Sequence, residues 1–155
     1  MIKIDRRTVA TLFLSATALV ALANLEAFRP SAYRDTANYV TIGYGTTQGV
    51  KMGDKITPEK ALFRLLNDTY TFQTAIKQCV KVPLTQYEYD AAAIFSYNVG
   101  ASAFCRSTMV KKWNAGDYQG GCEELSRWVY AGGMKSPGLV NRRAKEYRLC
   151  IGEAQ

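Results

Sequence analysis

Hydrophobic and polar positions divide the chain into an uncharged stretch near its start and a longer part with regular periodicity. The uncharged stretch runs from Thr8 to Leu25 and follows the basic residues Lys3, Arg6 and Arg7. As a helix, its 18 residues would extend about 27 Å, enough to cross the core of a bilayer. Much of the stretch is Ala, Thr and Ser, so the pattern predicts a weakly apolar membrane-seeking segment with a cytoplasmic N-terminus.

The region after this stretch predicts a small β structure. Residues 26–34 are expected to form a short helix that bends or stops at Pro30. From Asp35 to Gly53, β-forming residues alternate with glycines, a pattern typical of a hairpin or a small sheet. We therefore expect the sheet of the protein to lie near the start of its folded part.

Helix signals fill most of the remaining chain. Thr57, Pro58 and Glu59 supply an N-cap, a proline in the first turn and an early acid, which predicts a helix ending near Gln78. Periodicity and caps predict further helices over residues 85–99, 103–113, 118–128 and 140–150, with a loop at 131–138.

The helix that begins after Thr85 has the clearest start signal. Thr85 and Glu88 have the spacing of a capping box, and Gly100 marks the end of the helix. A small sheet followed by a helical lobe defines an α+β fold.

Composition indicates one folded domain with a basic surface. The 155 residues are 48% apolar and 21% charged, and 20 Lys and Arg against 13 Asp and Glu give a net charge of +7. Such a surface suits a polyanion, for which nucleic acid, anionic lipid and anionic cell wall are all candidates. The charges are scattered and form no basic stripe with interleaved aromatics, so we expect no nucleic acid partner.

The chain contains no histidine. This excludes Ser-His-Asp and Cys-His catalysis and any metal site that requires histidine. If the protein is an enzyme, carboxylate, Tyr or Lys side chains must transfer the protons.

Four cysteines, Cys79, Cys105, Cys122 and Cys150, are present without a C-x-x-C motif. An even number of cysteines behind an export-like leader favours two disulfides, each of which adds about 2–4 kcal/mol of stability. Of the three possible pairings, Cys79–Cys105 and Cys122–Cys150 are favoured because each closes a local loop. Four buried thiols in a cytosolic protein are the alternative.

The uncharged stretch has several interpretations. It fits a cleavable signal peptide, because Ala21-Leu22-Ala23 matches the A-x-A cleavage pattern. It also fits a permanent anchor, a reversible anchor that inserts and later leaves the membrane, or a core helix of a protein without a membrane stage. The weak hydrophobicity is explained best by the reversible anchor.

Glu26 and Asp35 stand nine residues apart, directly after this stretch. Cleavage of a glycosidic bond needs two carboxyl groups, one protonated to donate to the leaving oxygen and the other ionised. The hydroxyl of Thr41 is suited to holding a water molecule. Spacing alone is a weak signal, because acids at this distance are common on protein surfaces.

The residues around the two acids make the signal specific. The string E-x-x-R-x-x-A-Y-x-D, five further residues and T-I-G-Y-G resemble the phage lysozymes, the endolysins of glycoside hydrolase family 24. The resemblance continues through "VPLTQYEYDAAAIFSYNVG" and "AFCRSTMVKKWNAGDY" to "RWVYAGG" and "PGLVNRRAKE". It covers nearly all of residues 26–150.

The resemblance implies a lysozyme-like fold with a cleft between the sheet lobe and the helical lobe, and a muramidase that cleaves peptidoglycan. Glu26 would be the proton donor, and Asp35 and Thr41 would position and activate the attacking water. Hydrolysis with inversion would place the carboxyl groups roughly 6.5–9.5 Å apart. The resemblance implies no metal and no cofactor, and we expect a monomer.

Three more residues, Thr47, Tyr97 and Ser107, match family positions that contact sugar. For Tyr97 the alternative is a core aromatic, and for Ser107 it is a helix cap. Arg142, Arg143 and Glu146 also match the family and are interpreted as structural. Departures from the family pattern border the expected cleft: Ala27 replaces a usual Gly, Val40 a common Trp or Tyr, and Thr46 a frequent His.

Residues 8–25 resemble a signal-arrest-release segment, as found in relatives from phages of Gram-negative hosts. This implies two parts, a leader at 1–25 and a catalytic domain at 26–155. The leader would hold the inactive protein in the bacterial inner membrane, and release into the periplasm would activate it. Cleavage of the leader after Ala23 is the alternative to its release.

Two alternative functions remain for the protein: a lytic transglycosylase and a glycan-binding module without turnover.

Overall fold

The computed structural model describes residues 4–153, and the chain folds as two compact units. Residues 16–70 form the smaller unit. The residues before 16 and after 70 together form the larger unit. The predicted leader, 1–25, is therefore shared between the units, and its residues 1–3 lie outside the described part.

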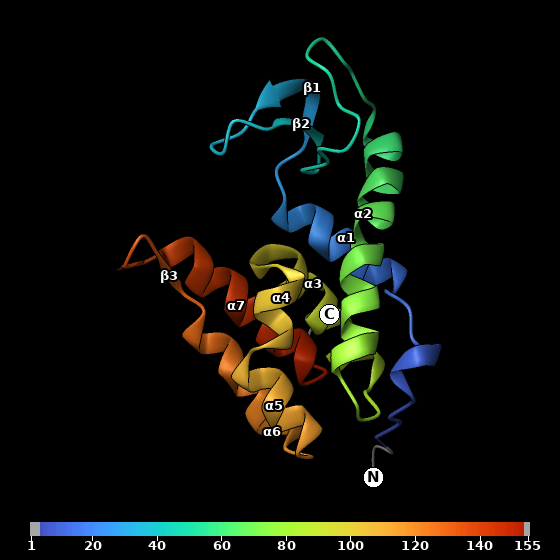
Figure 1. The fold of residues 1–155 in the computed structure, drawn as a ribbon, viewed down its shortest axis with the longest axis vertical. Helices are drawn as coiled ribbons and strands as arrows, with labels where there is room; N and C mark the ends of the chain where they lie inside the picture. Colours follow the sequence, from blue (N-terminus) through green and yellow to red (C-terminus); the bar gives the residue numbers. More distant parts are fainter. Residues whose placement is uncertain (1–3, 154–155) are drawn as a thin grey trace. The chain divides into compact units, whose positions relative to one another are not determined.

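The smaller unit contains a hairpin, but it begins before the predicted segment 35–53: only its second strand lies within that segment. Helix α1 (Ala16–Leu25) precedes strand β1 (Arg29–Arg34), which pairs antiparallel with β2 (Val40–Gly43). Figure 1 shows the two strands side by side, followed by the long loop that leads to α2 (Pro58–Cys79). In the register of the hairpin, Tyr33 lies opposite Thr41.

The prediction of a short helix over residues 26–34 is wrong, because β1 occupies most of that segment. The loop after β2 returns along β1 and supplies partners for its backbone. The Ala32 N–H donates to the Asp54 carbonyl at 2.9 Å, and the Ile56 N–H donates to the Pro30 carbonyl at 2.9 Å. Pro30 has no N–H to donate, so it fits in a short strand where its carbonyl alone is needed.

Close packing in the smaller unit depends on a glycine. Gly43 ends β2 with a φ of +65°, and a Cβ built on it would lie 2.9 Å from the Cβ of Ala61 in α2. Ile42, Ala61 and Leu65 are buried. The smaller unit thus brings β2 and α2 together at a distance that no larger residue at position 43 allows.

The larger unit is helical. Its helices are α3 (Gln86–Val99), α4 (Ala101–Cys105), α5 (Thr108–Asn114), α6 (Tyr118–Glu123), the 3-10 helix η2 (Glu124–Arg127) and α7 (Pro137–Cys150). They follow one another in yellow to red in Figure 1. Residues 88–96 of α3 are all buried, so this helix is the centre of the unit. Phe95, Phe104 and Trp113 are among the large side chains of the core.

Local end signals predict two helices well. Helix α2 starts at Pro58 and ends at Cys79, close to the predicted limits. Helix α3 has the predicted capping box: the Glu88 N–H donates to the Thr85 hydroxyl at 3.0 Å, and the Thr85 N–H donates to the Glu88 carboxylate at 2.8 Å. It ends at Gly100, whose φ is +94°.

The later elements depart from the prediction at their ends. The prediction of one helix over residues 103–113 is wrong. Helix α4 ends at Cys105, and a separate helix, α5, begins after its N-cap residue Ser107. Residues 131–138 are not simply a loop: β3 (Tyr130–Ala131) pairs with β4 (Met134–Lys135), and α7 begins at Pro137. Ser136 caps α7 by accepting from the Leu139 N–H at 3.3 Å.

Two disulfides join elements of the larger unit. Cys79 pairs with Cys105, and Cys122 pairs with Cys150, which is the pairing that the local loops favour. Arg142 and Arg143 both pair with Glu146 along α7. The Arg143 Nε also donates to the Trp128 carbonyl at 3.0 Å, so the structural interpretation of these charged residues is confirmed.

Residues 8–25 do not form one continuous helix in this structure. They form the 3-10 helix η1 (Val9–Thr11), an extended segment and α1, which has 10 residues. Within residues 4–153, none of the helices combines the length and the apolar character that crossing a bilayer requires.

Candidate active site

Asp35 lies in the tight turn that connects β1 to β2. Its N–H donates to the Tyr39 carbonyl at 3.0 Å, and its own carbonyl accepts from the Asn38 N–H at 2.9 Å. Asn38 adopts a φ of 68°, the left-handed conformation that Asn tolerates in turns. Arg34 adds a bond from its guanidinium to the Asn38 carbonyl at 3.0 Å. The backbone around Asp35 is therefore closely determined.

The Asp35 carboxylate accepts hydrogen bonds at both of its oxygens. Oδ1 accepts from the backbone N–H groups of Ala37 and Tyr39, each at 2.9 Å. Oδ2 accepts from the Thr41 hydroxyl at 3.3 Å. All three partners are donors, so both oxygens of the carboxylate act as acceptors.

Thr41 is buried in β2, so its position is set by the hairpin register. Its hydroxyl lies 3.3 Å from Asp35 Oδ2 and 3.1 Å from the Tyr39 carbonyl oxygen. A hydroxyl has one proton, which it donates to one of these acceptors at a time, and its lone pairs are acceptors. The Thr41 hydroxyl is thus suited to binding a water next to the Asp35 carboxylate.

Glu26 follows directly after α1. Its N–H donates to the Leu22 carbonyl at 3.1 Å, which extends the bonding of the helix by one residue. Leu22 is fully buried and Glu26 is half-buried. The position of Glu26 therefore depends on the formation of α1. Glu26, Asp35 and Thr41 all belong to the smaller unit.

The three expected sugar contacts are distributed over both units. Thr47 is exposed in the smaller unit, directly after the bridge between Ile42 and Thr46. Tyr97 is half-buried in α3 of the larger unit, with its ring centroid 5.3 Å from that of Phe72. Ser107, also in the larger unit, is 4% exposed and accepts from the Val110 N–H at 3.3 Å. The side chain of Ser107 is a helix cap, the alternative that the sequence leaves open.

Sequence reasoning missed two features of the smaller unit. The Asp35 turn depends on Asn38, and an Asp followed three residues later by Asn is a turn signal that could have found it. Thr46 donates its hydroxyl to the Asp68 carboxylate of α2. No local pattern predicts that contact, because the two residues are 22 positions apart.

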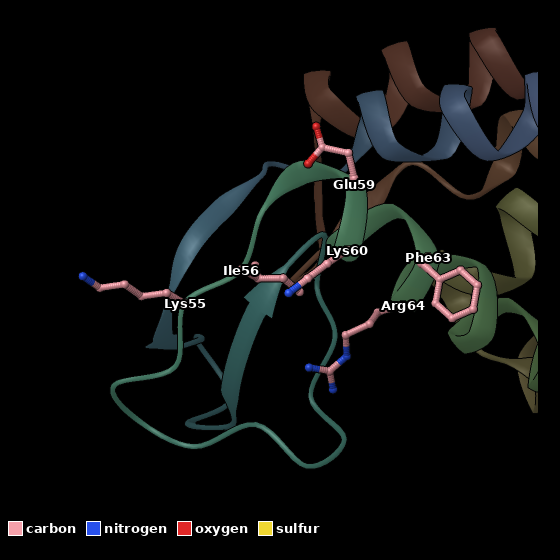
Figure 2. A pocket seen from close by; sticks show the side chains of 6 residues that line it. All are labelled: Lys55, Ile56, Glu59, Lys60, Phe63 and Arg64. Atoms are coloured by element: carbon pink, nitrogen blue, oxygen red, sulfur yellow. The ribbon is translucent and has the colours of Figure 1, made fainter.

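The smaller unit also has an open pocket of about 540 Å³, shown in Figure 2. Its lining residues come from the loop before α2 and the first turns of that helix: Lys55, Ile56, Glu59, Lys60, Phe63 and Arg64. None of the predicted site residues lines it. Among residues 4–153, no group of three or more His, Cys, Asp or Glu side chains is placed to hold a metal ion.

Comparison with known proteins identifies the family and the class of fold. Residues 23–146 match the phage lysozyme family. This match covers most of the chain and includes Glu26, Asp35 and Thr41. The protein therefore belongs to the phage lysozyme family, and the resemblance found in its sequence is confirmed.

Individual relatives agree with this assignment over most of their length. The SAR-endolysin of Pseudomonas phage phiKMV is 43% identical over 140 residues, which is 88% of this chain and 87% of that protein. The endolysin from Escherichia coli O157:H7 phage FAHEc1 has a TM-score of 0.84 at 38% identity, covering 93% of this chain and 96% of that one.

A mutant of P22 lysozyme has a TM-score of 0.86 at 33% identity, covering 92% of this chain and all of that one (100%). The expected lysozyme-like α+β fold is confirmed by these structures.

Proposed function

We propose that this protein is an endolysin that hydrolyses the β-1,4 bond between N-acetylmuramic acid and N-acetylglucosamine in peptidoglycan. Its role is lysis of the host cell and release of phage. Support comes from the match to the phage lysozyme family. It also comes from relatives named endolysins, whose similarity extends over most of this chain. The proposed substrate is the glycan strand, and the protein acts as a monomer without nucleic acid.

Glu26, Asp35 and Thr41 carry the reaction in this proposal. Glu26 donates its proton to the glycosidic oxygen as the bond to the anomeric carbon breaks. A water held by Asp35 and Thr41 attacks that carbon from the opposite face and loses a proton to Asp35. The products are a new reducing end and a free hydroxyl, with inversion at the anomeric carbon. Thr47 and Tyr97 contact the sugars, whereas the buried Ser107 caps α5.

The observation that carries this proposal is the fixed Asp35 carboxylate beside the Thr41 hydroxyl. Two backbone N–H groups and one hydroxyl orient the carboxylate. A water-activating base needs such fixed placement, because general base catalysis requires hydrogen-bond reach to the attacking water. A lytic transglycosylase uses a single acid and no activated water, so it gives Asp35 and Thr41 no role.

The test is digestion of purified peptidoglycan by the full-length protein. Hydrolysis yields reducing ends, whereas a transglycosylase yields anhydro-muramic ends, and mass spectrometry distinguishes them. Glu26→Gln and Asp35→Asn should each reduce turnover by about 10²–10⁴-fold. Two control variants, Glu59→Gln and Asp54→Asn, change acids of the same unit outside the proposed site and should leave turnover intact. Turnover that survives Glu26→Gln would overturn the proposal.

The same variants separate an enzyme from a glycan-binding module. If the protein only binds glycan, Glu26→Gln leaves its effect on the cell wall unchanged. If it is a muramidase, Glu26→Gln abolishes clearing of peptidoglycan while cosedimentation with the polymer persists.

The proposal includes a membrane-held stage before lysis. Residues 8–25 lie in the bacterial inner membrane at first, as the SAR-endolysin relatives suggest, and the protein later enters the periplasm. Glu26 follows α1 directly, so membrane insertion of this segment holds Glu26 at the bilayer surface, away from Asp35. N-terminal sequencing of the periplasmic form tests this: release retains Met1, whereas cleavage after Ala23 leaves Asn24 first.

A further inference from the structure

The ring of Phe28 contacts the ring of Tyr44 in the smaller unit. The two ring centroids are 5.3 Å apart and the ring planes are inclined by 48°, a separation at which aromatic pairs attract each other. Phe28 stands two residues after Glu26, and Tyr44 stands three residues after Thr41. The contact therefore joins the segment of the proposed proton donor to the segment of the proposed water-binding hydroxyl.

This ring pair continues the hairpin beyond its last paired residues. Arg29, the first residue of β1, lies opposite Gly43, the last residue of β2. Phe28 precedes Arg29 and Tyr44 follows Gly43, so the two rings occupy the next position along the antiparallel pair. The rings thus extend the association of the two segments by one step toward Glu26.

An irregularity in the hairpin gives this contact its importance. The register shifts between Arg29 and Tyr33: three residues separate them in β1, whereas one residue separates their partners Gly43 and Thr41 in β2. A bulge of this kind bends its strand and interrupts the ladder of hydrogen bonds. The regular pairing beside Thr41 therefore does not determine where the chain before Arg29 lies, and its position depends on further contacts.

Tyr44 is held at the tip of a closed turn. Ile42 and Thr46 exchange two backbone hydrogen bonds, at 2.9 Å and 3.0 Å, which close the turn at its base. Gly43 and Gly45, on either side of Tyr44, have φ angles of +65° and +98°, a conformation that glycine adopts readily. Ile42 is buried at the base of the turn. The turn therefore presents the Tyr44 ring from a backbone with little freedom.

Glu26 is restrained on both sides along the chain. On its N-terminal side, its N–H donates to the carbonyl of the buried Leu22 at 3.1 Å. On its C-terminal side, two residues of chain, which span at most about 7 Å, connect it to Phe28. A displacement of the Phe28 ring is therefore transmitted over a short distance to Glu26, whereas α1 maintains the other restraint.

We propose that Phe28 and Tyr44 are positioning residues for Glu26. Their ring contact holds the proton donor in place relative to Asp35 and Thr41, and neither ring transfers a proton. This inference rests on the proposed function, because the contact has this role only if Glu26 is the donor. A misplacement of about 1 Å can reduce the rate of an enzyme on the order of 100-fold, so loss of one ring should have a large effect on kcat.

The first test compares Phe28→Leu with Phe28→Tyr in the full-length protein on soluble peptidoglycan fragments. Phe28→Leu should lower kcat by about 10- to 100-fold and change KM by less than about 2-fold, because proton donation acts in the transition state and not in substrate binding. Phe28→Tyr keeps a ring and should retain most of kcat. The matched control is Phe63→Leu, at an exposed Phe of α2 in the same unit, and it should leave kcat unchanged. Equal kcat values for Phe28→Leu and Phe28→Tyr would overturn the proposal.

A double-mutant cycle with Tyr44→Leu assigns the effect to the ring contact. Once Tyr44 is Leu, the Phe28 ring has lost its partner, so adding Phe28→Leu should lower kcat by less than about 3-fold. Full additivity of the two losses would overturn the contact as their cause. If Phe28→Leu does not fold, Tyr44→Leu tests the same contact from its other side.

The leaving group separates a positioning role from a general loss of structure. A sugar hydroxyl is a poor leaving group that needs the proton of the donor, whereas a nitrophenolate leaves with little protonation. On the nitrophenyl β-glycoside of an N-acetylglucosamine–N-acetylmuramic acid disaccharide, Phe28→Leu should therefore retain at least about half of the wild-type rate. A structural defect lowers both rates by the same factor, so equal losses on the two substrates would overturn the proposal.

Glu26→Gln distinguishes failure of this inference from failure of the proposed function. If Glu26→Gln leaves cleavage of peptidoglycan intact, Glu26 is not the donor, and the proposed function and the positioning role are both wrong. If Glu26→Gln abolishes cleavage while Phe28→Leu and Tyr44→Leu keep the wild-type kcat, the proposed function stands and the positioning role alone is overturned.

Discussion

The Thr41 hydroxyl lies 3.3 Å from Asp35 Oδ2, across a turn whose backbone N–H groups bind the other carboxylate oxygen. Thr41 is fixed by β2 and Asp35 by the turn that precedes it. A side chain from one strand therefore orients a carboxylate at the end of its neighbour.

The first prediction concerns this hydroxyl. Thr41→Val keeps the shape of the side chain and removes its hydrogen bond to a charged group, so kcat on peptidoglycan should fall by about 10- to 100-fold. Thr41→Ser keeps the hydroxyl and should retain most of the activity. The control is Thr36→Val, which changes an exposed threonine of the same turn. Equal activity of the Val and Ser variants would show that the hydroxyl has no role.

The second prediction concerns the contact between β2 and α2. Gly43→Ala must accommodate both a φ of +65° and a Cβ only 2.9 Å from that of Ala61. Gly49→Ala is a matched control, because Gly49 has a φ of +70° and nothing within 4 Å of its Cβ position. In urea unfolding, Gly43→Ala should lower the free energy of unfolding by about 1–3 kcal/mol more than Gly49→Ala does. Equal losses would mean that backbone strain alone matters at position 43.

The third prediction is a pH dependence of stability. Burial raises the pKa of Asp90, although hydrogen bonds from Ser15 and Gln86 oppose the rise. Between the ordinary pKa and the raised one, the folded protein binds more protons than the unfolded chain. The contribution of Asp90 to stability therefore falls as the pH rises through that interval. The free energy of unfolding of wild type minus that of Asp90→Asn should decrease from about pH 4 upwards.

Glu59 provides a control of opposite sign. A hydrogen bond from its own backbone N–H, and a second one from the Thr57 side chain, lower the pKa of this exposed carboxyl group. The stability that Glu59 contributes is present above its ordinary pKa and is lost as the pH falls through the lowered pKa. The free energy of unfolding of wild type minus that of Glu59→Gln should therefore increase with pH. The corresponding difference for Asp90→Asn should decrease with pH. Two slopes of the same sign would contradict the assigned cause of the Asp90 shift.

The fourth prediction separates the effect of leader hydrophobicity on membrane release from its effect on folding. Ala16 and Thr17 are exposed in α1, whereas Ala18 is 2% exposed. Ala16→Leu and Thr17→Leu should strengthen membrane retention and delay lysis while leaving the Tm of the purified protein within about 2 °C of the wild type. Lysis by these variants on the normal schedule would contradict the release mechanism.

Ala18→Leu is the contrasting variant. It adds a similar apolar group at a buried position, so it should lower the stability by about 1–3 kcal/mol through overpacking. Differential scanning calorimetry of the three variants measures this difference. A stable Ala18→Leu variant would show that the surroundings of α1 adapt to a larger side chain.

Elements that are defined by their own residues could be predicted from the sequence. The starts of α2 and α3 follow from local signals, a Pro in the first turn at Pro58 and a capping box at Thr85 and Glu88. Elements that depend on distant partners could not be predicted. Residues 29–34 are a strand because they pair with β2 and bind Asp54 and Ile56 of the following loop, and the residues of the strand alone do not contain that information.

The same distinction applies to the candidate site and the leader. The family spacing predicts Glu26, Asp35 and Thr41 as site residues, but only the structure shows that backbone N–H groups hold the Asp35 carboxylate. The hydrogen bonds from Ser15 to Asp90 could not be predicted either, because these residues are 75 positions apart.

The separation of Ser15 and Asp90 along the chain also sets a delay during synthesis on the ribosome. At about 5–20 residues per second, the 75 residues between Ser15 and Asp90 take roughly 4–15 s to translate. During that time the partners of Ser15 in α3 do not yet exist. The proposed membrane-held stage therefore begins while the leader has no competing contact in the folded protein.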